Sequence, residues 1–299
     1  MSLSELEYLK LLKKVLHEGD IRQTRNGQTR SLFGEQLKFN LRDDGFPLLT
    51  TKKMFLKGII AELIWFLNGQ TDNKILKEQG VHIWDGNSTR EYLDSRGLYY
   101  NEDECGPIYG FQWRRFNCPY PGSDIPINLI PIQKKEQDQL AEVVRLIKEE
   151  PMSRRIIINS WNPCQLRDMC LEPCHVLYQF YVRIGNDGKK MLSCHMYQRS
   201  ADLFLGVPFN IASSALLVYI IANITQCIPD QLTISFGDVH IYEDHIGVVE
   251  EQILRNPFEY PQLVIKKECS MEILGELKTS DFEILNYNSH GTLRAKMAA

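Results

Sequence analysis

The 299-residue sequence lacks the features that divide a chain into separate parts or direct it out of the cell. It contains no internal repeat, low-complexity tract or Ser/Gly-rich linker, which predicts a single domain over residues 1–299. The N-terminus has neither the basic start nor the apolar core of a signal peptide, and no uninterrupted apolar run is long enough to cross a bilayer. We therefore expect a cytoplasmic protein, with the nucleus as the alternative, and no membrane partner.

An excess of positive charge is also missing. The chain has 34 Lys and Arg against 38 Asp and Glu, for a net charge of −4. This balance argues against a surface that coats nucleic acid, so RNA binding cannot be inferred and any anionic ligand must be held by local arginines. The eight cysteines show no regular spacing, and without a secretion signal they are expected to be reduced thiols.

Four stretches have the periodicity of helices. Residues 4–18 combine an apolar face with a Ser4-x-x-Glu7 capping box and with Gly19 as a terminator. Residues 56–67 are apolar on nearly every side, as a buried helix would be, and 140–147 form an amphipathic pattern that stops before Pro151. Residues 208–225 begin with a proline and continue as a core helix.

Strand patterns concentrate in the second half of the chain. Residues 176–184 alternate with period two, and the turn at 185–188 leads back into 191–199, which predicts an antiparallel hairpin. Residues 155–161 and 233–239 are further strand candidates. Long helices mixed with hairpin-connected strands indicate an α/β or α+β fold with a large mixed sheet.

Cys174 precedes the first strand of this hairpin within the sequence Glu-Pro-Cys-His. A buried structural thiol is one interpretation, because free cysteine is among the most buried residue types. A nucleophile is the other, and Pro173 favours an irregular entry to the strand that suits it. His175 need not contact the sulfur, since adjacent strand residues point to opposite faces. A zinc site with Cys164 and Cys170 is disfavoured, because two of the three separations exceed the usual Cys-x(2–4)-Cys spacing.

Polar residues interrupt apolar surroundings at several other places. Arg199 lies in a polar cluster before the 208–225 helix, where a guanidinium suits a phosphate better than it suits core or surface. Glu62 lies inside the most apolar helix, as a buried carboxyl with a perturbed pKa would. Asn210 offers a donor and an acceptor, to a cap or to a ligand edge. His240 and Tyr242 share one strand face.

Together these segments closely resemble the folate-dependent, flavin-independent thymidylate synthases. The matching stretches are FPLLTTKK (46–53), ELIWFLNGQT (62–71), HIWD (82–85), GPIYGFQWR (106–114), SRRIIINSWNP (153–163), EPCH (172–175), YQRSADLFLGVPFNIAS (197–213) and GDVHIYEDH (237–245). They follow the family's order and cover nearly the whole chain. The resemblance implies a large mixed sheet covered by helices, with two subunits joined sheet to sheet.

The resemblance also implies a reaction. Cys174 adds to carbon 6 of the uracil ring of dUMP, carbon 5 takes the one-carbon unit of 5,10-methylenetetrahydrofolate, and hydride transfer yields dTMP and dihydrofolate, without metal or flavin. The thiolate is favoured by the neighbouring Arg199. The implied catalytic residues are Cys174, Glu62, Tyr109, His175, Asn210 and Asp202. The implied dUMP ligands are Arg25, Arg154, Arg155, Gln198, Arg199, Ser200, Asp202, Asn210, His240 and Tyr242. The implied folate contacts are Lys52, Trp84, Asp202, Leu205, Gly206, Phe209 and Ala299.

Within this resemblance, Arg154 and Arg155 reach across the homodimer to complete the partner's phosphate site. The phosphate loop departs from the family pattern, because residues 24–29 are one residue shorter between the arginine and the final threonine. Arg25 is our choice for the mobile phosphate arginine, with Arg22 as the alternative. Glu172 stands where a small residue or proline is common, and it adds negative charge near the thiol.

Two other functions stay open at this point. A hydroxymethylase would quench the same intermediate with water, and relatives that act on dCMP place Asp where Asn210 stands, which favours dUMP here. A non-catalytic nucleotide- or RNA-binding protein on the same scaffold would not need Cys174, Glu62 or Tyr109.

Overall fold

The computed structural model describes residues 2–125, 129–133 and 135–297. Its helices are α1 (Leu3–Glu18), α2 (Leu56–Leu67), α3 (Lys74–Lys77), α4 (Asp85–Ser88), α5 (Arg90–Ser95), α6 (Tyr109–Arg115), α7 (Gln139–Glu149), α8 (Gly206–Thr225) and α9 (Ile246–Gln252). Its strands are β1 (Asp20–Thr24), β2 (Gly27–Phe33), β3 (Gln36–Asn40), β4 (Ile157–Asn159), β5 (His175–Ile184), β6 (Lys190–Asp202), β7 (Ile228–Tyr242), β8 (Gln262–Ile265) and β9 (Phe282–Leu285).

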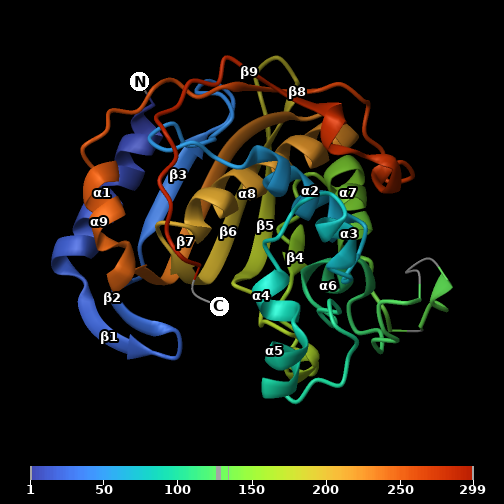
Figure 1. The fold of residues 1–299 in the computed structure, drawn as a ribbon. Coiled ribbons are helices and arrows are strands. Elements are labelled where there is room, and N and C mark those ends of the chain that lie inside the picture. Colours follow the sequence, from blue (N-terminus) through green and yellow to red (C-terminus); the bar gives the residue numbers. More distant parts are fainter. Residues whose placement is uncertain (1, 126–128, 134, 298–299) are drawn as a thin grey trace.

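A seven-stranded mixed sheet forms the centre of the molecule (Figure 1). Six of its strands follow the order β1-β2-β7-β6-β5-β4, and β3 pairs with β7 beyond the end of β2. Strands β6 and β7 run parallel, and the other neighbours in this sheet are antiparallel. The remaining strands, β8 and β9, form a separate two-stranded sheet. The predicted fold class, a large mixed sheet covered by helices, is therefore confirmed.

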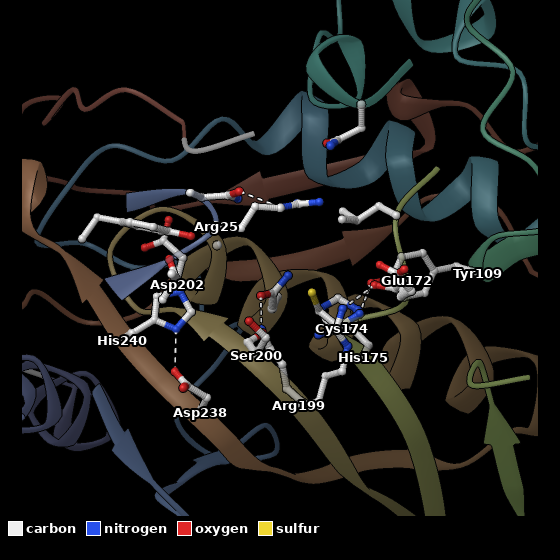
Figure 2. Close-up of a pocket in the computed structure, with 18 of the residues that line it drawn as sticks. Arg25, Tyr109, Glu172, Cys174, His175, Arg199, Ser200, Asp202, Asp238 and His240 are labelled. Atoms are coloured by element: carbon white, nitrogen blue, oxygen red, sulfur yellow. Dashed lines mark hydrogen bonds and ion pairs between the residues drawn. The ribbon is translucent and has the colours of Figure 1, made fainter. Parts of the chain in front are cut away.

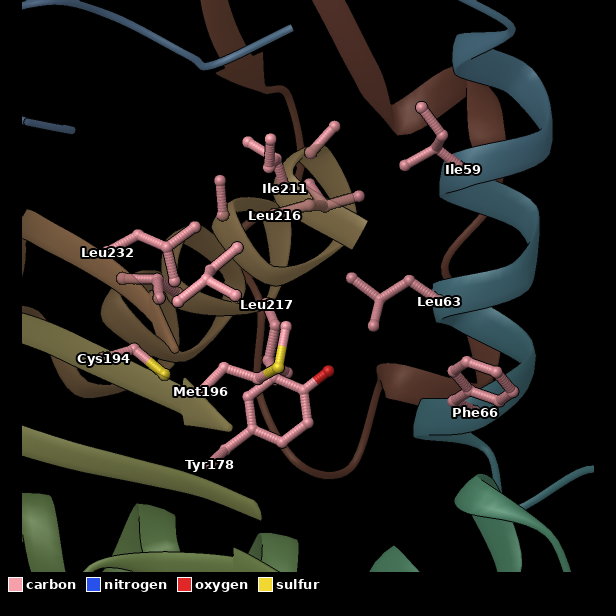
Figure 3. Close-up of a cluster of buried hydrophobic side chains, with 14 of the residues drawn as sticks. Ile59, Leu63, Phe66, Tyr178, Cys194, Met196, Ile211, Leu216, Leu217 and Leu232 are labelled. Atoms are coloured by element: carbon pink, nitrogen blue, oxygen red, sulfur yellow. The ribbon is translucent and has the colours of Figure 1, made fainter. Parts of the chain in front are cut away.

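Helix α8 makes the crossover between the two parallel strands and packs against both of them. Parallel neighbours need a long connection, and a helix buries its apolar side on the sheet that it crosses. Figure 3 shows Leu216 and Leu217 of α8 in the cluster that lies between Met196 of β6 and Leu63 of α2. All four side chains are at most 1% exposed. The core therefore lies between the sheet, α8 and α2.

The length and composition of α8 correct one expectation. The segment Gly206–Thr225 is long and apolar enough to cross a membrane, whereas the sequence had suggested that no segment is. The helix passes this test because it is a core helix with an apolar surface all round, and 78% of the span lies buried inside the protein.

The helix predictions are confirmed with small shifts at their ends. Helices 56–67 and 140–147 appear as α2 and α7, and 208–225 starts two residues earlier as α8. The predicted capping box of α1 is wrong. Its N-cap is Ser2, whose hydroxyl accepts from the Glu5 amide, and Ser4 lies inside the helix. Gly19 does cap the C-terminus, through a hydrogen bond from its amide to Val15.

The strand predictions are confirmed in position but not in length. The hairpin of β5 and β6 closes through the turn at 185–188, where Gly188 has a φ of +77°. Strand β4 keeps only three of the seven residues predicted over 155–161, because it is an edge strand that pairs only with β5. Strand β7 is far longer than 233–239, because β6 pairs along one side and β2 and β3 share the other.

Candidate active site

A cavity of about 610 Å³ opens where β5, β6 and β7 meet the N-terminus of α8 (Figure 2). Helix α2 and the turn between β1 and β2 contribute further walls. The lining residues are Thr24, Arg25, Asn26, Thr29, Glu62, Phe66, Trp84, Asn87, Tyr109, Leu171, Glu172, Cys174, His175, Gln198, Arg199, Ser200, Asp202, Gly206, Asn210, Asp238, His240 and Tyr242. The cavity thus brings together side chains that are up to 218 residues apart in the chain, from Thr24 to Tyr242.

Cys174 lies directly before β5, and both of its backbone polar groups are fixed. Its amide donates to the Tyr109 hydroxyl at 2.7 Å, and its carbonyl accepts from the Arg199 amide at 2.9 Å. The β5–β6 register shifts between His175 and Leu177, so the strand begins irregularly beside the thiol. Of the eight free cysteines, only Cys174 lines this cavity.

The ionisation of Cys174 differs from the expectation. Burial raises the pKa of the thiol above its ordinary value, although Arg199 and the Tyr109 hydroxyl act in the opposite direction. Arg199 therefore favours the thiolate as predicted, but its charge does not outweigh desolvation in the unliganded protein. Burial also raises the pKa of Tyr109 well above that of a free phenol, so this hydroxyl stays protonated.

Arg199 is tied to the segment that carries the thiol. Its Nε donates to the Pro173 carbonyl at 2.9 Å and its Nη2 donates to the Glu172 carbonyl at 2.8 Å. The guanidinium also lies over the Trp161 ring, 5.4 Å from its centroid. A cation held this firmly loses little side-chain entropy when it binds an anion.

Asn210, the fifth residue of α8, lines the cavity. Its Oδ1 accepts from Gln198 Nε2 at 2.9 Å, and the same Gln198 nitrogen donates to the Ser200 carbonyl at 3.0 Å. The neighbouring His175 is buried and shares a hydrogen bond of 3.1 Å with the Tyr178 hydroxyl. Burial lowers the pKa of His175 to about 4, so the ring is neutral at pH 7. These residues form a neutral polar wall that suits an uncharged ring with donors and acceptors on its edge.

Glu62 is the carboxyl that α2 contributes to the cavity. It accepts a hydrogen bond of 2.8 Å from Trp84 Nε1 and projects from the apolar helix α2. Burial raises its pKa from 4.5 to about 7, with the Trp84 hydrogen bond acting in the opposite direction. A carboxyl with this pKa holds and releases protons at physiological pH, as a general acid or base must.

His240 and Tyr242 share one face of β7, as the sequence predicts, with ring centroids 5.2 Å apart. His240 Nδ1 pairs with Asp238 Oδ1 at 2.9 Å, and Asp238 also forms an ion pair with Arg22. Arg22 does not itself line the cavity, and its guanidinium is already paired with Asp238. Arg25, at the tip of the β1–β2 hairpin, is exposed and lines the cavity (Figure 2).

The predicted folate contacts are only partly on the cavity wall. Trp84, Asp202 and Gly206 line it, whereas Leu205 and Phe209 pack partly buried against the core. Asp202 Oδ1 accepts from the amides of Phe204 and Leu205, which fixes the turn into α8.

Three predicted ligands lie away from the cavity. Lys52 is buried, with its ammonium on the Phe204 carbonyl and over the Phe204 ring, and burial lowers its pKa to about 7. A contact with a folate tail would require this side chain to turn. Arg154 and Arg155 are exposed and do not line the cavity of their own chain. Ala299 lies outside the described residues.

Sequence reasoning missed some of the lining. Asp238 precedes His240 by two residues, so the period-two rule that paired His240 with Tyr242 could also have found it. Phe66 lies one helical turn from Glu62 and could have been found by the same kind of argument. Thr29 comes from β2, for which no pattern was recognised.

The cavity unites a thiol, a fixed cation, an amide that can read a ring edge, and a carboxyl with a pKa near 7. These are the parts of an enzyme that works through a covalent bond between its thiol and an anionic ligand. Among the described residues, no three His, Cys, Asp or Glu side chains are arranged to hold a metal ion.

Comparisons with known proteins agree with this class. The family model described as thymidylate synthase matches residues 6–299. The chain is 48% identical over 301 residues to the thymidylate synthase of Saccharomyces cerevisiae, covering 98% of this chain and 97% of that protein. It is 47% identical over 298 residues to that of Agaricus bisporus, covering 98% and 99%. It is 43% identical to the bifunctional dihydrofolate reductase-thymidylate synthase of Leishmania major, of which it spans 55%. The chain belongs to the thymidylate synthase family.

Proposed function

We propose that the protein methylates dUMP to dTMP, with 5,10-methylenetetrahydrofolate as the donor of both the carbon and the hydride. The observation that carries this proposal is that Cys174, the fixed cation Arg199 and the Asn210 amide line a single cavity. A phosphate on Arg199 and a uracil edge on Asn210 would bring the ring to the sulfur.

The residues of the chain divide the work as follows. Arg199, with Ser200 and Arg25, binds the phosphate, and His240 and Tyr242 hold the deoxyribose hydroxyl. The Cys174 sulfur adds to carbon 6 of the ring, which makes carbon 5 nucleophilic. The folate supplies the one-carbon unit and the hydride.

Proton transfers are assigned to Glu62 and to the residues around Tyr109. Glu62, with its pKa of about 7, exchanges protons through ordered water with the oxygen of the ring enolate. The Tyr109 hydroxyl accepts from the Cys174 amide and, as a protonated phenol, orients a water molecule that takes the proton leaving carbon 5. His175, neutral at pH 7, orders water with Gln198 and does not serve as a cation.

The raised pKa of the Cys174 thiol means that the thiolate has to be stabilised during the reaction. Because burial raises the pKa of Cys174, the thiolate has to be favoured by bound ligand or by proton loss to a neighbour.

Trp84, Gly206 and Asp202 would form the wall on which the folate ring packs above the nucleotide.

The test combines the protein with dUMP and methylenetetrahydrofolate and follows dihydrofolate absorbance. Cys174→Ala should abolish turnover and largely spare dUMP binding, whereas Cys164→Ala, at an exposed thiol outside the cavity, should retain turnover. Retained turnover in Cys174→Ala would remove this residue as the nucleophile. Hydroxymethyl-dUMP as the product, without dihydrofolate, would overturn the methylation.

We also propose a homodimer joined through the sheet. Tyr181 and Tyr197 are 63% and 40% exposed on the sheet face opposite the buried Phe180 and Met196. Exposed aromatic side chains on a sheet face are typical of a surface that a partner covers.

The eight free thiols suit a reducing compartment, which supports the proposed cytoplasmic or nuclear location.

In this dimer, Arg154 and Arg155 would enter the partner's phosphate site, since they are exposed and absent from their own cavity. Mixing Cys174→Ala with an Arg154→Ala/Arg155→Ala double variant tests this. Each variant alone should be inactive, and random exchange should restore about a quarter of wild-type activity, because half the dimers are mixed and each has one intact site. An unrestored mixture would show that the arginines do not act across the interface.

A further inference from the structure

An ion pair joins the rim of the cavity to a distant helix end. Arg96 follows α5, and its Nη2 binds the Glu172 carboxylate. The two side chains are only 23% and 30% exposed, so the pair is partly shielded from water and salt. Glu172 lines the cavity and stands two residues before Cys174.

The carboxylate of Glu172 is an electrostatic problem for a site that binds an anion. Its main-chain carbonyl accepts from Arg199 Nη2 at 2.8 Å, so the residue lies beside the cation assigned to the phosphate. Its charge also raises the pKa of the Cys174 thiol. An unpaired carboxylate here would oppose both a bound phosphate and the thiolate.

Glu172 is nevertheless charged. Burial alone would raise its pKa, but the hydrogen bond from Arg96 and the nearby positive charges hold the pKa below the ordinary glutamate value. Among the described residues, Arg199 and the Tyr109 hydroxyl favour the Cys174 thiolate, the Glu172 carboxylate disfavours it, and Tyr242 is a further titratable group in electrostatic contact with it. Arg96 is the partner that can cancel this one unfavourable charge.

We propose that Arg96 is a positioning residue of the active site, which neutralises Glu172 and so preserves an electropositive phosphate site and a reactive Cys174. Arg96 does not contact the substrate; it acts through Glu172, which it also holds in place at the head of the 172–174 segment. The part of the proposal that concerns dUMP rests on the proposed function, whereas the part that concerns the thiol does not.

The first test is a charge cycle in steady-state kinetics. Arg96→Met should raise the KM for dUMP about five- to tenfold, since one uncompensated charge then acts on a phosphate dianion across a partly screened distance. The double variant Arg96→Met/Glu172→Gln should return the KM to within about twofold of the wild type, because it removes the charge that Arg96 cancels. Glu172→Gln alone should leave the KM unchanged or lower it.

Arg167→Met is the matched control. Arg167 lines the groove that adjoins the cavity, together with Arg96, Glu172 and Arg199, but it forms no ion pair with Glu172 among the described residues. Loss of this arginine should therefore change the KM by much less than loss of Arg96. Equal effects of the two substitutions would show that the groove needs only general positive charge, and would overturn the proposal.

The second test needs no substrate. The rate of Cys174 alkylation by iodoacetamide, followed against pH, should show its midpoint moved upward by about half a pH unit or more in Arg96→Met and restored in the double variant. If the double variant behaves like Arg96→Met in both tests, Arg96 does not act by neutralising Glu172, and the proposal is overturned. Absence of dTMP formation by the wild type would refute the proposed function instead, and would leave the alkylation result standing.

Discussion

Glu62 gives the sharpest test of how the cavity is built. Its pKa of about 7, against an ordinary 4.5, means that the folded protein prefers the protonated carboxyl. The folded state therefore binds more protons than the unfolded state between about pH 4.5 and 7, and stability falls as the pH rises through this window. Above pH 7 the folded protein has to hold a desolvated carboxylate.

The magnitude follows from the same values. At about 1.4 kcal/mol for each pH unit, the difference between 4.5 and about 7 corresponds to at most about 3.5 kcal/mol. Because the carboxyl lines a cavity that water can enter, we expect about 1–2 kcal/mol in practice. Glu62→Gln removes this cost and can still accept the Trp84 hydrogen bond.

The assay compares the free energy of unfolding of Glu62→Gln and the wild type by urea denaturation at pH 5, 6, 7 and 8, at one protein concentration. The variant should gain about 1–2 kcal/mol over the wild type between the ends of this range, while it loses turnover. Glu91→Gln, at an exposed residue of α5, should give a difference that does not change with pH. A flat difference for Glu62→Gln as well, or one that falls with rising pH, would refute the reasoning.

Two further predictions concern the core and the sugar site. Leu217→Ala in α8 removes a fully buried side chain and should cost about 2–5 kcal/mol in the free energy of unfolding, measured by denaturation; a loss below 1 kcal/mol would mean that the core around α8 collapses to fill the cavity. Asp238→Asn weakens the hydrogen bond that orients His240 and should raise the KM for dUMP about three- to tenfold with a smaller change in kcat; an unchanged KM would show that His240 needs no such support.

The apolar helices could be predicted from sequence because their composition already contains the reason for their burial. Helix α2 is apolar on nearly all sides and α8 is longer still, so both read as core elements without knowledge of their partners. Strand β1 could not be found from its sequence pattern. All five residues of β1 are exposed, so an edge strand of this kind carries no alternation.

Site residues that lie within a short sequence motif could be predicted. Properties that depend on contacts between residues far apart in the sequence could not. Cys174, Arg199 and Asn210 lie in short, specific stretches, and the structure brings them to one cavity. The net effect on the Cys174 pKa could not be read from its neighbours in sequence, because desolvation depends on everything packed around the sulfur. The ion pair between Arg96 and Glu172 joins positions that no spacing rule connects.

The sheet topology also sets an order of events during synthesis. Strands β2 and β3, near the N-terminus, pair with β7 at positions about 200 residues later, as Thr29 with Tyr242 and Gln36 with Ser235. During synthesis, the β1–β2 hairpin that carries Arg25 therefore has no β7 to pair with along the other edge of β2 until almost the whole chain has been made. Contacts of such long sequence separation fold slowly, so the nascent protein needs protection of that edge, and the cavity is completed only in a late, largely post-translational step.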